Sequence, residues 1–143
     1  MQAWSVERMR ELGTRHSTLE ARGELEPLLA TLVAEPIYEF HPMGLCMRGG
    51  DVVRRFYTQF CQQFLPLRHS YVLIGEWASE REVVQEYDVK LRVEGKVEAH
   101  RVIGILYAEG ELLAGERVYA SERFIRLMTG ELFEELEPIP SKE

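Results

Sequence analysis

The chain has 143 residues, of which 45% are hydrophobic and 29% are charged. This mixture is typical of a globular protein and the length is that of one domain, so we expect residues 1–143 to form a single domain. The formal net charge of −7 argues against a nucleic-acid partner, because phosphate binding requires a basic surface.

Membrane and secreted classes are not favoured by the sequence. Apolar runs such as residues 102–106 are far shorter than the roughly 20 residues that a membrane helix needs. The first residues lack the basic and apolar regions of a secretory signal. Cys46 and Cys61 are too few for a disulfide framework. We therefore expect a cytoplasmic protein with reduced thiols and no membrane partner.

Three helices are expected in the first half of the chain. The first follows a helical spacing of apolar residues between Ser5, a typical N-cap, and Gly23, a typical helix end. A shorter helix is expected over residues 25–33, with Pro27 in its first turn. The third is expected to begin with Asp51 as its N-cap and to carry one apolar stripe. That stripe consists of Val53, Phe56, Tyr57, Phe60, Cys61 and Phe64.

Strands dominate the rest of the chain. Alternating apolar and polar residues predict a short strand over residues 37–41 and four longer strands, with glycine-centred turns between the last three. The longer strands are expected over residues 70–77, 81–93, 97–108 and 112–121. Ser121 is expected to cap a last helix that ends at Gly130, and residues 131–143 are expected to form a partly ordered acidic tail. Helices followed by consecutive strands predict an α+β fold with an antiparallel sheet.

Three stretches carry a resemblance to a known superfamily. Residues 22–28 (RGELEPL) resemble the Gly-Asp/Glu-Leu junction between its first two helices, and residues 48–57 (RGGDVVRRFY) resemble the start of its third helix. Residues 115–121 (GERVYAS), followed by 126–130 (RLMTG), resemble the ending of SnoaL-like proteins. In order and spacing these motifs are similar to the nuclear transport factor 2-like superfamily, in its SnoaL-like polyketide cyclase and ketosteroid isomerase-related branch.

The resemblance implies a cone-shaped, curved antiparallel sheet wrapped around the N-terminal helices, the cystatin-like α+β barrel. It also implies a hydrophobic pocket for a small hydrophobic ligand, no cofactor, and a homodimer formed through the sheet. Two functions follow as alternatives, since a fold does not assign chemistry. One is acid–base isomerisation or cyclisation of a carbonyl compound, and the other is a non-catalytic dimeric module for ligand binding or association.

Candidate catalytic residues are His41, Asp88, His100 and His16. The resemblance places His16 near a first-helix tyrosine that donates to an oxyanion, and His41 near the Asp-Pro of ketosteroid isomerase. Asp88 falls at the Arg-x-Asp of limonene epoxide hydrolase, where Glu86 replaces the arginine. The unperturbed histidine pKa of about 6.5 suits proton transfer at neutral pH. Acid–base chemistry requires at least two of the four candidates to face one cavity.

Other positions weaken the catalytic alternative. Ser121 stands where the family has an acid, and the oxyanion-donating acid of ketosteroid isomerase would fall near Gly104. Glu86 is expected to repel Asp88, which argues against epoxide hydrolysis. The alternative for both residues is a row of charged side chains on the outer face of the sheet, exposed to solvent or to a dimer partner.

The expected ligand contacts are Tyr57, Trp77, Tyr119 and Glu86, with core packing as the alternative for the aromatic residues. No metal is expected, because no histidine pair has ligand spacing and no Cys-x-x-Cys occurs.

Overall fold

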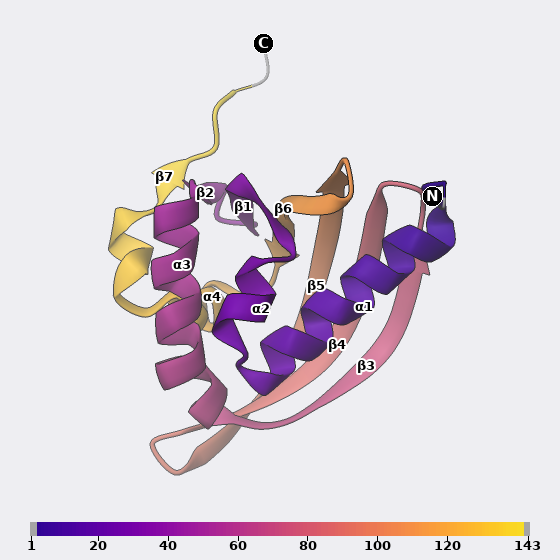
Figure 1. The fold of residues 1–143 in the computed structure, drawn as a ribbon. Coiled ribbons are helices and arrows are strands. Elements are labelled where there is room, and N and C mark those ends of the chain that lie inside the picture. The colour runs from indigo at the N-terminus through magenta and orange to yellow at the C-terminus, as the bar shows by residue number, and fades with distance from the viewer. Residues whose placement is uncertain (1–2, 142–143) are drawn as a thin grey trace.

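The computed structural model describes residues 3–141 and shows a strongly bent sheet that curves around the first helix (Figure 1). Helix α1 (Val6–Arg22) lies across strands β3 (Arg68–Ala78) and β4 (Glu82–Val93), with α2 (Leu25–Leu29) and α3 (Gly50–Gln59) beside it. This arrangement confirms the α+β fold. Among the described residues no helix combines the length and the apolar character needed to cross a bilayer.

Helix α1 begins and ends as predicted. The Ser5 hydroxyl accepts a hydrogen bond from the Arg8 backbone N–H at 3.2 Å. Gly23 ends the helix with a left-handed φ of 67°, which a glycine adopts at little cost. The buried side of the helix carries Met9 and His16, so one imidazole is brought into the interior.

The predictions for the next two helices need correction. Helix α2 ends at Leu29, short of the expected residue 33, because the chain is already extended from Leu32 in β1 (Leu32–His41). The N-cap of α3 is Gly49, with a φ of 104°, and Asp51 lies in the first turn instead. Its last turns continue as a π-helical segment over Phe60–Phe64 and a 3-10 turn over Leu65–Leu67.

The sheet has seven strands in the order β3-β4-β5-β6-β1-β2-β7 and does not close. Neighbouring strands are antiparallel, except that β1 and β6 run parallel. The four longer predicted strands and the expected strand over residues 37–41 are all present. Strands β1, β3 and β5 are longer than predicted, and β4 and β6 are one or two residues shorter. The bounds of the remaining strands are Leu45–Arg48 for β2, Lys96–Glu109 for β5, Leu112–Tyr119 for β6 and Glu137–Pro138 for β7.

The end of the chain is more ordered than predicted within the described residues. Helix α4 (Glu122–Thr129) is capped as expected, since the Ser121 hydroxyl accepts a hydrogen bond from the Phe124 N–H at 3.1 Å. A 3-10 helix (Gly130–Glu135) and β7 follow, and β7 pairs with the unpredicted strand β2. Residues 142–143 of the expected tail lie outside the described part of the chain.

The close approach of β6 to β1 requires a glycine at position 115. A Cβ there would overlap the carbonyl oxygen of Ile37, the residue opposite on β1, and would lie 2.7 Å from the Tyr107 hydroxyl. That hydroxyl donates a hydrogen bond to the same carbonyl at 2.9 Å. Gly115 thus lets three strands meet at the point where the sheet bends.

We expect Gly115→Ala to lower the free energy of unfolding by about 2–4 kcal/mol, because a methyl group must displace backbone. The matched control is Gly110→Ala, where φ is 65° but no atom lies within 4 Å of the new Cβ. It should cost only about 1 kcal/mol, from the left-handed backbone alone. Urea unfolding of both variants measures the difference, and equal losses would contradict the assigned role of Gly115.

Candidate active site

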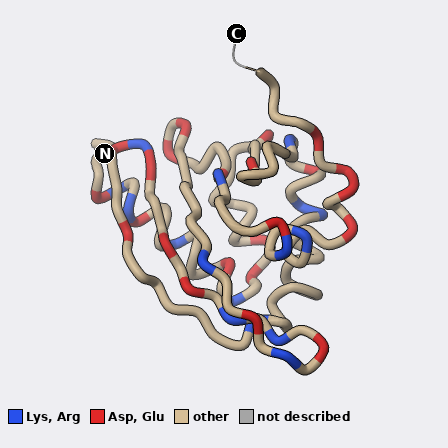
Figure 2. The backbone as a smooth tube through the Cα atoms, turned by 180° about the vertical axis from the view of Figure 1, so that it is seen from behind, with Lys and Arg blue, Asp and Glu red and all other residues tan. Residues whose placement is uncertain are grey.

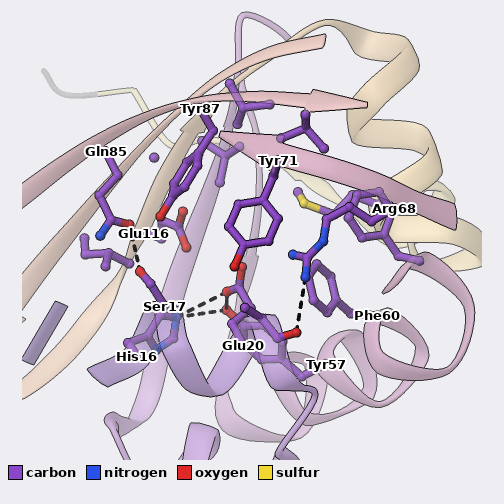
Figure 3. A pocket seen from close by; sticks show the side chains of 18 of the residues that line it. His16, Ser17, Glu20, Tyr57, Phe60, Arg68, Tyr71, Gln85, Tyr87 and Glu116 are labelled. Atoms are coloured by element: carbon purple, nitrogen blue, oxygen red, sulfur yellow. Dashed lines mark hydrogen bonds and ion pairs between the residues drawn. The ribbon is translucent and has the colours of Figure 1, made fainter. Parts of the chain in front are cut away.

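A cavity of about 100 Å³ lies between α1, α3 and the concave side of the sheet. Aromatic side chains form much of its wall, and a group of polar side chains faces one another within it (Figure 3). The aromatic residues are Tyr38, Phe56, Tyr57, Phe60, Phe64, Tyr71, Tyr87 and Phe124. The polar residues are His16, Ser17, Glu20, Arg68, Gln85 and Glu116. Such a cavity suits a small ligand with few polar groups.

The tautomer of His16 is set by its neighbours. Its Nδ1 lies 2.8 Å from the Thr31 hydroxyl, which donates its own proton to the Leu28 carbonyl at 2.6 Å. A hydroxyl has one proton, so Nδ1 must donate to Thr31 and a neutral imidazole keeps its lone pair on Nε2. That nitrogen lies 3.4 Å from Glu20 Oε2, because residues four apart share one face of a helix.

Two tyrosines extend this network. The Tyr57 hydroxyl donates to Glu20 Oε2 at 3.0 Å, and it can then accept the proton of the Tyr38 hydroxyl at 2.7 Å. Burial raises the pKa of both tyrosines well above their ordinary value of 10.0. Both hydroxyls therefore remain protonated donors, and they orient the Glu20 carboxylate.

Glu116 on β6 brings a second carboxyl group to the cavity. Burial raises its pKa well above the ordinary value of 4.5, and the nearby charge of Glu20 raises it further. Its Oε2 lies 2.5 Å from the point that a Cβ on Gly104 would occupy. An acid thus stands beside Gly104, where the resemblance indicated a missing donor. Among the described residues, nothing hydrogen-bonds to this carboxyl group.

Three of these side chains could hold a cation. The ligand atoms of His16, Glu20 and Glu116 all lie within 4.8 Å of one another, and no other such group occurs within residues 3–141. One nitrogen and two carboxylate oxygens are donors that Zn²⁺ accepts. Sequence spacing alone does not predict this set as a whole, because Glu116 lies on a strand almost 100 residues after the helix that carries His16 and Glu20.

Of the four expected catalytic residues, only His16 lines the cavity. The imidazole of His41 is 2.9 Å from Glu39 Oε1 and stacks on Tyr119 with ring centroids 4.7 Å apart. His100 shares the concave side of β5 but packs on Phe124 and lies 3.0 Å from Glu98 Oε1. The structure therefore does not bring two of the four expected groups into one cavity.

Asp88 and Glu86 lie outside the cavity and share one cation. Arg101 on β5 contacts the Asp88 carboxylate at 2.6 Å and that of Glu86 at 2.8 Å. An arginine from the neighbouring strand thus bridges the two acids and offsets part of the expected repulsion between them. Acidic and basic residues are interspersed in the same way along much of the described chain (Figure 2).

Of the four expected ligand contacts, only Tyr57 lines the cavity. Trp77 is 56% exposed and Tyr119 is 41% exposed. Sequence reasoning did not assign the acids Glu20 and Glu116. The spacing of both residues could have indicated them. Glu20 follows His16 by four residues and so shares its helix face, and Glu116 shares a strand face with Val118, which also lines the cavity.

The raised pKa of Glu116 makes the stability of the protein depend on pH. The folded state favours the neutral form of Glu116, and this preference contributes to the free energy of unfolding. The contribution is complete below the unfolded-state pKa near 4.5 and is lost as the pH rises through the folded-state pKa. Glutamine stays neutral throughout. We expect Glu116→Gln to become progressively more stable relative to the parent between about pH 5 and about pH 9.

Urea unfolding across that pH range measures this difference. The control is Glu109→Gln at an exposed position of β5, whose stability relative to the parent should not change with pH in this way. A constant difference between Glu116→Gln and the parent would contradict the raised pKa.

No family model and no curated protein sequence matches this chain. Solved structures with similar folds do match. Bal32a, from a soil-derived mobile gene cassette, has a TM-score of 0.70 at 10% identity, covering 87% of this chain and 97% of that one. A nuclear transport factor 2-like protein from Anabaena variabilis has a TM-score of 0.66 at 20% identity, covering 85% and 95%.

A third structure, described as a candidate ketosteroid isomerase from Kribbella flavida, has a TM-score of 0.68 at 14% identity, covering 84% of this chain and 83% of that one. Identities this low speak for the fold and not for a shared reaction. The bent sheet and the helices on its concave side superpose on these neighbours over most of their length. The chain therefore has the fold of the nuclear transport factor 2-like superfamily.

Proposed function

We propose that the protein binds a small, largely apolar carbonyl compound in the cavity and moves a proton on it, as an isomerase or cyclase does. One observation carries this proposal: a carboxyl group held neutral, that of Glu116, faces the same cavity as the Glu20 carboxylate, with ligand atoms of both within 4.8 Å of each other. Two carboxyl groups at one place, one of them with a pKa raised by burial, can supply an acid and a base.

Glu116 is the hydrogen-bond donor of the reaction. Its carboxyl group has no partner among the described residues, so its proton is available to a ligand oxygen. A substrate carbonyl at hydrogen-bond distance would gain negative charge when the adjacent carbon loses a proton. A donor in an apolar, enclosed site stabilises that charge more strongly than water does.

Glu20 is the base. It takes the proton from the carbon next to the carbonyl and returns it to another carbon of the resulting enol or enolate, so that no atom is gained or lost. Tyr57 is a positioning residue, since its hydroxyl donates to Glu20 Oε2 at 3.0 Å. His41, Asp88 and His100 have no part in this proposal, because none of them lines the cavity.

The structural neighbours support a reaction of this class. Besides the Kribbella flavida protein, a candidate isomerase from Bacillus subtilis has a TM-score of 0.65 at 14% identity. Their descriptions name isomerases, and this chain has the carboxyl groups that such proton transfer needs.

The second proposed function is a non-catalytic module that binds a ligand or a second copy of the chain. The observation in its favour is the apolar surface of the edge strand β3, where Val72 is 58% exposed and Ile74 is 47% exposed. An exposed apolar strand at a sheet edge is a typical association surface. A cytoplasmic homodimer formed through the sheet fits this alternative.

The two proposals differ in α-proton exchange. We expect the protein to catalyse exchange of α-protons for deuterium in small cyclic ketones dissolved in D₂O, followed by NMR. Glu116→Leu removes the donor and should slow exchange by about 10²–10³-fold, and Glu20→Gln removes the base and should slow it by about 10²–10⁴-fold. Glu109→Gln should exchange at the parent rate.

Binding of the ketones without exchange would favour the passive module. Exchange that survives in both Glu116→Leu and Glu20→Gln would show that other groups carry the chemistry. Circular dichroism of each variant confirms that a slow rate reflects chemistry and not unfolding.

A further inference from the structure

Arg68 is a cation beside the cavity with no acid to neutralise it. It is the first residue of β3, where the chain leaves the 3-10 turn, and it is the one lysine or arginine among the described residues that line the cavity. Within residues 3–141 no carboxylate lies in ion-pair distance of it. Other arginines of this acidic chain do find such partners, for example Arg101 with Asp88 and Arg117 with Glu82.

Two contacts hold the Arg68 guanidinium in place. It lies over the ring of Tyr71, 4.2 Å from the ring centroid, and its Nη2 donates a hydrogen bond to the Ala21 carbonyl at 3.2 Å. Ala21 belongs to the last turn of α1, whose carbonyls attract a cation. A guanidinium has five N–H donors in a planar fork, so this structural role uses one and leaves the others for a ligand.

We propose that Arg68 binds a carboxylate of the substrate, so that the protein acts on a small, planar oxo acid that carries an unsaturated or aromatic group. The oxo-group half of this assignment rests on the proposed function, whereas the carboxylate half rests on Arg68 alone. In Figure 3, Arg68 and Glu116 lie on opposite sides of the Tyr71 ring. A ligand between them presents its carboxylate to one and its carbonyl oxygen to the other.

The surroundings fit such a ligand in shape, and they offer it one cation and one neutral donor. Phe60 and Tyr71 line the cavity near Arg68 and offer flat apolar surfaces (Figure 3). Arginine matches a carboxylate geometrically, because two parallel N–H groups can reach its two oxygens. At the other end, the neutral Glu116 carboxyl group can donate to an oxygen atom and adds no negative charge that would repel an anion.

Isothermal titration with benzoate and benzamide tests the anion site. The two probes share size and shape and differ in charge. We expect the parent protein to bind benzoate roughly tenfold or more tightly than benzamide. Arg68→Gln should abolish this preference and leave the affinity for benzamide within about threefold of the parent. Arg68→Lys should keep part of the preference, since it retains the charge but not the fork. Arg48→Gln, at an exposed position outside the cavity, should behave as the parent does.

Equal affinity of the parent for the two probes, or no binding of either, would overturn the anion site. So would a benzoate preference that persists in a folded Arg68→Gln variant, with folding checked by its urea unfolding curve. The titration is independent of the proton transfer. Glu116→Leu should retain the benzoate preference, so a protein that prefers benzoate but exchanges no α-protons would keep the anion site and lose the proposed reaction.

Discussion

The placement of the Glu116 carboxyl group beside Glu20, with no lysine or arginine among residues 3–141 paired to it, is the constraint on which the candidate site depends. An ionised carboxylate in such a place costs several kcal/mol, about as much as the whole stability of many domains. The protein avoids much of this cost because the acid stays neutral. The remaining cost is that the group must stay protonated. A protonated carboxyl group is also a hydrogen-bond donor.

The fold supplies the space for this arrangement through two glycines. Gly104 has no side chain, and Oε2 of Glu116 lies 2.5 Å from the position that a Cβ would take. Gly115, next to Glu116 in the chain, lets β6 approach β1 and Tyr107 so closely that the sheet bends around α1. Curvature and site chemistry therefore come from neighbouring positions on two paired strands. Much of the remaining cavity wall is aromatic or aliphatic, and an apolar wall strengthens the electrostatic effect of each polar group.

Features set by local chemistry could be predicted from the sequence, and features set by distant contacts could not. Ser5, Gly23 and Ser121 mark helix ends through their own backbone and side-chain preferences, and all three predictions are confirmed. Strand β7 has two residues, and it exists because it pairs with β2, about 90 residues earlier in the chain. Asp51 has the usual N-cap side chain, but the backbone at Gly49 turns the chain two residues earlier. Residue periodicity places His16 on an inward face, yet it carries no information on the distance to Glu116 across the fold.

The brevity of α2 has a consequence for the imidazole of His16. Leu28 lies in α2, and Thr31 lies just beyond its end at Leu29. The Thr31 hydroxyl accepts from His16 Nδ1 and donates to the Leu28 carbonyl. This chain of hydrogen bonds keeps the proton of a neutral His16 imidazole on Nδ1. A five-residue helix that does not line the cavity with its polar groups thus helps to decide that Nε2 of His16, and not Nδ1, faces Glu20.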